Sequence, residues 1–200
     1  MIGNDDVQPA RVLEGVVGLQ DVIRAISASV RQVNLVALNA IVLTESQQEG
    51  GRGFALVAQE MRALSGRLES EMSTLLSTSV AAVRTAAQLL SATRRRRLLA
   101  TCIRLAPQAA ARLDVEGPVR AARARVREAQ AEVRKCLVET TKLGLMLTVV
   151  ARFARLEAAY GDGIAEQLAV VSDDFARASA NISGSLVSLS EHQKKLEAFG

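Results

Sequence analysis

The chain has 200 residues, of which 49% are hydrophobic and only 2% aromatic, and its net charge is +4. This composition favours long helices over a mixed α/β core. The sequence shows neither an apolar run approaching the ~20 residues that cross a bilayer nor a signal-like start. We therefore expect a cytoplasmic protein that does not span the membrane.

Residues that usually carry catalysis are scarce and poorly placed. Cys102 and Cys136 lack any CxxC or Cys/His spacing, so we expect buried structural thiols rather than a zinc site or a disulfide. The single histidine, His192, falls at a packing position of a helical pattern. We expect no metal, no cofactor and no enzymatic activity.

Apolar residues recur at alternating spacings of three and four in four segments of the chain. The first two segments are residues 12–40 and 54–68, separated by a glycine cluster at positions 50, 51 and 53. The third and fourth are residues 119–154 and 168–199, separated by Gly161 and Gly163. Pro107 and the pair Gly117-Pro118 break the helical pattern between the two halves.

Four such segments predict an all-α fold, an elongated antiparallel four-helix bundle with up-down-up-down topology. Residues 1–200 then form one bundle. We expect a first hairpin over residues 10–105 with its turn near 47–53, a connection over residues 106–118, and a second hairpin over residues 119–200 with its turn near 160–164. Both turns then lie at the same end of the bundle.

The two halves of the chain can be aligned without a gap. A shift of 114 positions places Ala55 on Ala169 and Ser65 on Ser179, and it brings the apolar positions into register. An internal duplication explains this register, and chance agreement between two heptad patterns is the alternative.

The stretch around the first turn resembles the signalling tip of methyl-accepting chemotaxis receptors. The resemblance is carried by Gln32, Asn34, Leu35, residues 37–40, Glu49, residues 51–55, Val57, Ala58, Glu60, Arg62 and Leu64. In that family two hairpins form a dimeric four-helix bundle, and the dimers cluster as trimers. The resemblance implies a bend that docks a CheA-like histidine kinase and a CheW-like coupling protein, or that inserts among receptor tips.

The sequence also departs from the receptor pattern. Leu43, Ser46 and Gln48 stand where receptors usually have Glu, Arg and Gly, among the residues of their trimer contacts. In the second half, residues 157–159 are Glu-Ala-Ala, as in the receptor family at the equivalent place. The asparagines and the Gly-Arg-Gly-Phe sequence are not found there. We hypothesise that one chain imitates a receptor dimer, and a homodimer is the alternative.

We expect the first bend to bind a partner through apolar anchors and polar orienting groups. Leu35, Leu38 and Val42 lie off the core seam and are expected to face outward. The alternative is that Leu35, Val36, Ile41 and Val42 pack against the second hairpin. Side-chain hydrogen bonds of Asn34 and Asn39 can connect the two helices of the first hairpin near its turn. Glycines in this turn accept a positive φ. The candidate residues are Asn34, Leu35, Leu38, Asn39, Val42, Glu49, Arg52, Phe54 and Val57.

A basic patch is expected at the other end of the bundle. Its residues are Arg94, Arg95, Arg96, Arg97, Arg120, Arg123 and Arg127. Acidic lipid, nucleic acid or an acidic protein could bind such a patch, and a solvated arginine surface is the alternative. Aromatic residues do not interleave to stack bases, so we expect no nucleic acid.

These features lead to two hypotheses for function. The first is a non-enzymatic chemosensory signalling or scaffold protein that docks partners through its receptor-like tip. The second is a structural, self-associating helical bundle that binds an acidic surface through its arginine-rich end.

Overall fold

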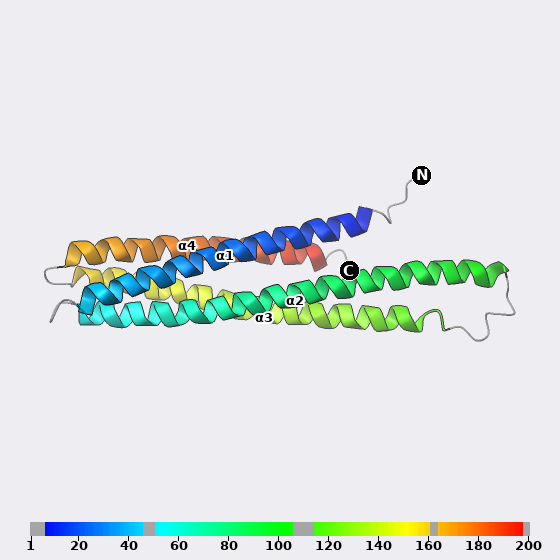
Figure 1. Cartoon of the computed structure of the whole chain (residues 1–200), viewed down its shortest axis with the longest axis horizontal. Coiled ribbons are helices and arrows are strands. Elements are labelled where there is room, and N and C mark those ends of the chain that lie inside the picture. Colours follow the sequence, from blue (N-terminus) through cyan, green and yellow to red (C-terminus); the bar gives the residue numbers. More distant parts are fainter. Residues whose placement is uncertain (1–6, 46–50, 106–113, 161–163, 198–200) are drawn as a thin grey trace.

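The computed structural model describes residues 7–45, 51–105, 114–160 and 164–197, and within them the side chains of residues 18–45, 51–105, 114–160 and 164–194. In these ranges the chain forms four helices and no strand. They are α1 (Val7–Glu45), α2 (Arg52–Leu105), α3 (Gly117–Ala159) and α4 (Ala165–Glu197). Successive helices run antiparallel along one rod (Figure 1). The predicted all-α four-helix bundle is confirmed.

The helices surround a common core, because each packs mainly against two neighbours. α1 packs against α2 and α4, and α3 packs against the same two helices. The α1–α2 and α3–α4 bends lie at the same end of the rod, which we call the tip (Figure 1). At the other end, α2 and α3 continue past the end of α4. Most of both bends, including Gly50 and residues 161–163, lies outside the described residues.

The buried stripe of each helix is wider than a single seam of the sequence pattern. Val57 and Val171 lie on the seams of the sequence pattern, but they are half-buried, while the following residues Ala58 and Ser172 are fully buried. The same holds in α3 around residues 136–137 and 150–151. A helix that contacts two neighbours buries a broader face than one strand of a two-helix coiled coil, so adjacent positions share the core.

The shift of 114 positions carries the buried residues of the first hairpin onto buried residues of the second. In α1 these are Leu19, Ile23, Ile26, Val30, Val33, Ala37, Ala40 and Thr44, which map onto Val133, Leu137, Thr140, Gly144, Leu147, Ala151, Ala154 and Ala158. In α2 they are Phe54, Ala58, Met61, Leu64, Ser65, Leu68, Met72, Leu75 and Ser79, which map onto Leu168, Ser172, Phe175, Ala178, Ser179, Ile182, Leu186, Leu189 and Gln193. One shift fits both helices and the bend between them, which favours duplication over chance register.

Differences between equivalent positions are compensated by neighbours. Val30 of α1 is replaced by Gly144 in α3, and a Cβ atom at Gly144 would lie 2.5 Å from Leu186 Cδ1. Leu186 of α4 therefore occupies the space that a side chain at position 144 would need. The core keeps its density although its residues have changed.

A pair of phenylalanines joins the two hairpins near the tip. The rings of Phe54 in α2 and Phe175 in α4 are stacked, with centroids 6.4 Å apart and an interplanar angle of 24°. Both side chains are buried. Because α2 and α4 belong to different hairpins, this contact holds the hairpins together as well as filling the core.

Two expectations from the sequence are corrected: that the chain has no apolar segment long enough to cross a bilayer, and that both cysteines are buried. The segment Gly18–Glu45 of α1 is long and apolar enough to cross a membrane by length and composition, with a mean hydropathy of 1.4. In the bundle its core-facing side chains pack with those of the other helices.

Cys102 is exposed and Cys136 is half-buried, so Cys102 is not a buried structural thiol. Cys102 lies near the C-terminal end of α2. This end of α2 continues past the end of α4, so fewer helices are present to cover it (Figure 1).

Replacing the buried ring of Phe175 tests the core. We expect Phe175→Ala to lower the free energy of unfolding by about 3–5 kcal/mol, because it removes the ring and leaves a cavity. Phe153→Ala is the matched control, since Phe153 is exposed on α3. Urea unfolding followed by far-ultraviolet circular dichroism measures both, and an equal loss for the two variants would contradict the assigned core.

Candidate functional site

The outward face of α1 near the tip carries apolar residues. Leu35 and Val42 lie seven residues apart and therefore on the same face of the helix, and they are 61% and 68% exposed. Asn39 is also exposed, and Leu38 is half-buried. Exposed aliphatic side chains grouped at one end of a rod provide a surface for a partner.

The asparagines do not tie the two arms together as expected. Asn34 is half-buried and Asn39 is exposed, and neither side chain makes a hydrogen bond to another described residue. Asn39 lies beside the core-facing Ala40, but about 100° further round the helix, which directs it outward. The amide of Asn39 is therefore available to a partner instead.

The other predicted tip residues fall in different environments. Phe54 is only 1% exposed and stacks on Phe175, so it supports the tip from inside and cannot itself contact a partner. Val57 is half-buried against the core, and Arg52 is exposed at the start of α2. Glu49 lies outside the described residues.

An exposed apolar residue near the first bend was missed by the sequence analysis. Leu56 of α2 is exposed near the tip. It is two residues from both Phe54 and Ala58, which are buried, and a helix turns by about 200° over two residues. Its position between two core residues was a usable signal for an outward-facing leucine.

Each exposed apolar residue at the first bend has an exposed apolar equivalent at the second. Under the 114-residue shift Leu35, Val42 and Leu56 correspond to Val149, Leu156 and Val170, and all six are exposed. We call the first three tip surface one and the second three tip surface two. The two hairpins thus repeat the outward apolar positions as well as the core positions.

Tip surface two is extended by aromatic residues that the sequence analysis did not single out. Phe153 on α3 and Tyr160, the residue that follows α3, are exposed, and Phe153 is the equivalent of Asn39. With Met146, Val149 and Leu156 they form a second seam at spacings of three and four. This spacing on α3, beside the core seam, was the available signal. The first hairpin therefore presents a polar centre where the second presents an aromatic one.

Close packing between Thr44 and Gly51 closes the first bend. A Cβ atom on Gly51 would lie 3.0 Å from Thr44 Cβ and 3.3 Å from Thr44 Cα. The Thr44 hydroxyl is buried and lies 2.9 Å from the carbonyl oxygens of both Ala40 and Ile41. Neither Gly51 nor Gly53 has a positive φ, so the expected conformational role of these two glycines is corrected. Gly51 is needed for close approach instead.

A carboxylate from the second hairpin lies against the start of α2. The Glu157 side chain of α3 occupies the space in which a Cβ atom of Gly53 would stand. Gly53 is in the first turn of α2, and a negative charge near a helix N-terminus is stabilising. This contact links the two hairpins at the tip.

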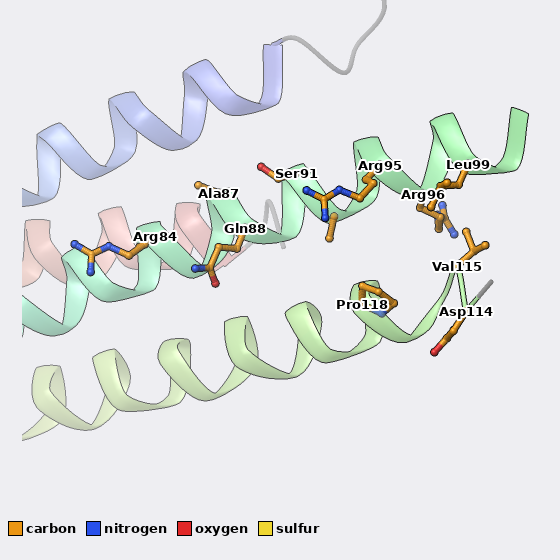
Figure 2. Close-up of a pocket in the computed structure, with 11 residues that line it drawn as sticks. Arg84, Ala87, Gln88, Ser91, Arg95, Arg96, Leu99, Asp114, Val115 and Pro118 are labelled. Carbon is orange, nitrogen blue, oxygen red and sulfur yellow. The ribbon is translucent and has the colours of Figure 1, made fainter. Parts of the chain in front are cut away.

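The predicted basic patch lies at the opposite end, on α2 and α3. Arg94, Arg95, Arg97, Arg120, Arg123 and Arg127 are exposed, while Arg96 is half-buried. Arg96 Nη1 donates a hydrogen bond to Glu116 Oε1 at 3.1 Å. A groove of about 430 Å³ lies at this end and is lined by residues of α2 and α3. Figure 2 shows lining residues, with Arg84 and Arg95 on α2 and Pro118 on α3. Residues 84–105 and 114–130 are called the basic end below.

The arrangement at the tip suits the binding of a partner. Among the residues that the structure describes, no group of three His, Cys, Asp or Glu side chains is placed to hold a metal ion. What the tip offers is apolar helix surface with nearby amide and guanidinium groups. Such a surface can dock a protein.

Two glycine substitutions test the contacts at the first bend. Gly51→Ala should lower the free energy of unfolding by about 1–3 kcal/mol, because the new methyl group meets the Thr44 backbone and Cβ atom. Gly53→Ala should be neutral or stabilising by up to about 1 kcal/mol, because the Glu157 carboxylate can move aside and alanine favours the helix. Thermal unfolding measures both, and a larger loss for Gly53→Ala would refute this account.

Comparison with known proteins gives local similarity. No family model matches the chain. It is 44% identical over 57 residues to the methyl-accepting chemotaxis protein CtpM of Pseudomonas aeruginosa, covering 28% of this chain and 10% of that protein. It is 46% identical over 48 residues to McpN of the same organism, covering 24% and 9%. HlyB of Vibrio cholerae is 45% identical over 58 residues, covering 29% and 10%.

The chain thus spans about a tenth of the length of the curated relatives it matches. The matched segment is short, but its identity of about 45% is found in three chemotaxis proteins from two organisms. This similarity supports a role in chemosensory signalling. The chain is a four-helix bundle that contains a segment similar to methyl-accepting chemotaxis proteins.

Proposed function

We propose that this protein is a non-enzymatic chemosensory signalling or scaffold protein that docks its partners through the tip. The partner is a CheW-like coupling protein or a CheA-like histidine kinase, or the tip inserts among receptor tips. The proposal places the protein in the cytoplasm without a membrane span. It assigns recognition to tip surface one, where the receptor-like sequence lies.

The observation that carries the proposal is the exposed apolar surface at the paired bends. Leu35, Val42 and Leu56 are solvent-exposed although they lie in helices whose other faces are packed. Large apolar side chains are the usual anchors of helix-surface docking, and polar groups around them fix orientation. Asn39 and Arg52 are exposed nearby and supply such groups. Leu38, Asn34 and Glu49 remain candidates for the edge of this surface.

The register between the hairpins supports the idea that one chain imitates a receptor dimer. Equivalent core positions are buried in both hairpins, and the three positions of tip surface one are apolar and exposed in both. The hairpins differ at the centre of the surface, where Asn39 corresponds to Phe153. A partner that recognises the receptor-like sequence would therefore bind tip surface one and not tip surface two.

A pair of matched double variants tests this assignment. Leu35→Asp with Val42→Asp should lower affinity for a purified CheW-like protein from the same organism by about thirtyfold or more, since loss of buried anchors costs about 2 kcal/mol or more. Val149→Asp with Leu156→Asp, at the equivalent positions of the second hairpin, should leave binding unchanged. Pull-down and calorimetric titration provide the measurements.

Circular dichroism of both variants shows whether the helices are intact, which is expected because all four residues are exposed. Unchanged binding by the Leu35 and Val42 variant would remove the proposal. Loss of binding only in the Val149 and Leu156 variant would move the docking site to the second hairpin.

The mass in solution tests the imitation of a dimer. If one chain supplies both hairpins, light scattering should give a monomer of 21.3 kDa at micromolar concentration. A stable homodimer of about twice that mass would contradict this part of the proposal, because a dimeric receptor-like bundle would then be formed by two copies.

A further inference from the structure

The basic end has a charge opposite to that of the rest of the molecule. It contains ten arginines, Arg84, Arg94, Arg95, Arg96, Arg97, Arg104, Arg120, Arg123, Arg125 and Arg127. Its carboxylates are Asp114, Glu116 and Glu128. The basic end therefore carries a net charge of +7, and because the whole chain carries +4, the remaining residues carry −3. Such an uneven distribution creates a strong local positive potential.

Two of the three carboxylates of the basic end already have structural roles. Asp114 Oδ1 accepts hydrogen bonds from the backbone N–H groups of Glu116, at 3.2 Å, and Gly117, at 2.7 Å, at the start of α3. Glu116 forms the ion pair with Arg96 that links α2 to α3. They hold the fold of this end, and its net charge of +7 already includes both of them.

Leucines are exposed in the middle of this positive surface. Leu98 and Leu105 of α2 are 64% and 83% exposed, and they are seven residues apart, so they lie on one face of the helix. Arg94 lies one turn before Leu98 on nearly the same face, and Arg104 and Arg95 lie on its two sides. All three arginines are exposed. Leucine and arginine side chains are therefore interspersed on this face of α2.

Arginines of α3 extend the positive surface around the basic end. Arg120, Arg123 and Arg127 follow spacings of three and four and form one stripe, and Arg125 lies on the other side of the same helix. All four are exposed. Positive charge thus surrounds the segment formed by α2 and α3 beyond the end of α4 (Figure 1).

We propose that the basic end binds the surface of an anionic phospholipid bilayer, with Leu98 and Leu105 inserted between headgroups and the arginines paired with lipid phosphates. Exposed leucines on a cationic helix face are the combination that interfacial membrane binding uses, because the acyl boundary accepts the leucines and the anionic headgroups attract the arginines. The proposal is independent of the partner of the tip.

The residue types of the basic end favour lipid over nucleic acid. Nucleic acid would pair with the arginines, but it accepts a leucine only by unstacking a base step, whereas the acyl boundary of a bilayer accepts exposed leucines directly. Single strands are usually held by aromatic stacking, and the basic end contains no Phe, Tyr or Trp. A bilayer accounts for both the charge and the exposed leucines.

The native thiol of Cys102 provides a direct probe of insertion. Cys102 is exposed on α2 between Leu98 and Leu105, whereas Cys136 is half-buried and can be removed as Cys136→Ser. An environment-sensitive fluorophore on Cys102 should brighten with vesicles of phosphatidylcholine and phosphatidylserine, and not with phosphatidylcholine alone. Sedimentation of the unlabelled full chain with the same vesicles gives the partition coefficient.

Variants separate the charge and insertion parts of the proposal. Leu98→Gln with Leu105→Gln should lower partitioning about tenfold or more and abolish the fluorescence change. Arg94→Gln, Arg95→Gln and Arg104→Gln together should lower it about a hundredfold, at about fivefold for each charge. The tip variant Leu35→Asp with Val42→Asp is the matched control and should partition like the unmodified chain. Circular dichroism identifies any variant that has lost its helices.

Several outcomes would overturn the proposal. Equal, weak partitioning to both vesicle types would show that the basic end does not bind anionic lipid. Undiminished partitioning of the leucine variant would exclude insertion. Binding of a duplex DNA fragment more tightly than anionic vesicles, at the same salt concentration and without dependence on Leu98 and Leu105, would assign the basic end to nucleic acid.

Discussion

The apolar stripes of the four helices are buried against one another, and this mutual burial determines the geometry of both ends of the molecule. Because each helix packs against two neighbours, the bends of both hairpins are held side by side at the tip. The Phe54–Phe175 stack and the contact of Glu157 with Gly53 connect the hairpins close to those bends. Residues on the opposite faces of the helices are left to solvent, and they form the tip surfaces.

The two hairpins share a pattern of burial but present different surfaces. Core positions correspond under one shift of 114 residues, although Val30 has become Gly144 and Thr44 has become Ala158. Outward positions have diverged further in character, from Asn39 to Phe153. Burial constrains size and polarity in the core, whereas an exposed position is constrained only by what it binds. Two related hairpins with different faces can therefore serve different contacts.

The rod differs chemically between its ends. The tip combines exposed aliphatic and aromatic side chains, and the basic end combines arginines with two exposed leucines. In the proposed arrangement the basic end rests on an anionic bilayer while the tip projects toward signalling proteins. Helices α2 and α3 connect the two ends without interruption within the described residues, so the distance between the two sites is fixed by helix length.

The sequence by itself determined the helical class, the four-segment topology and the location of the receptor-like stretch. A repeat of three and four residues specifies an amphipathic helix through local geometry, and glycine and proline interrupt it locally. The same geometry placed Leu35 and Val42 off the seam, which left open whether they face outward or pack against the second hairpin. Leu56 and Phe153 could have been found in the same way.

Which residues near the tip are covered depends on how the four helices pack together. Phe54 and Val57 were assigned to a binding surface, but Phe54 packs on Phe175 and Val57 is half-buried against the core. The expected asparagine contacts between the two helices of the first hairpin were absent among the described residues. Glycine is needed at position 51 because the backbone there lies close to Thr44. These outcomes depend on how closely neighbouring helices approach and on which residues face each other across the core. A sequence pattern gives the face of each helix, but the distance and register between helices arise from packing of all four together.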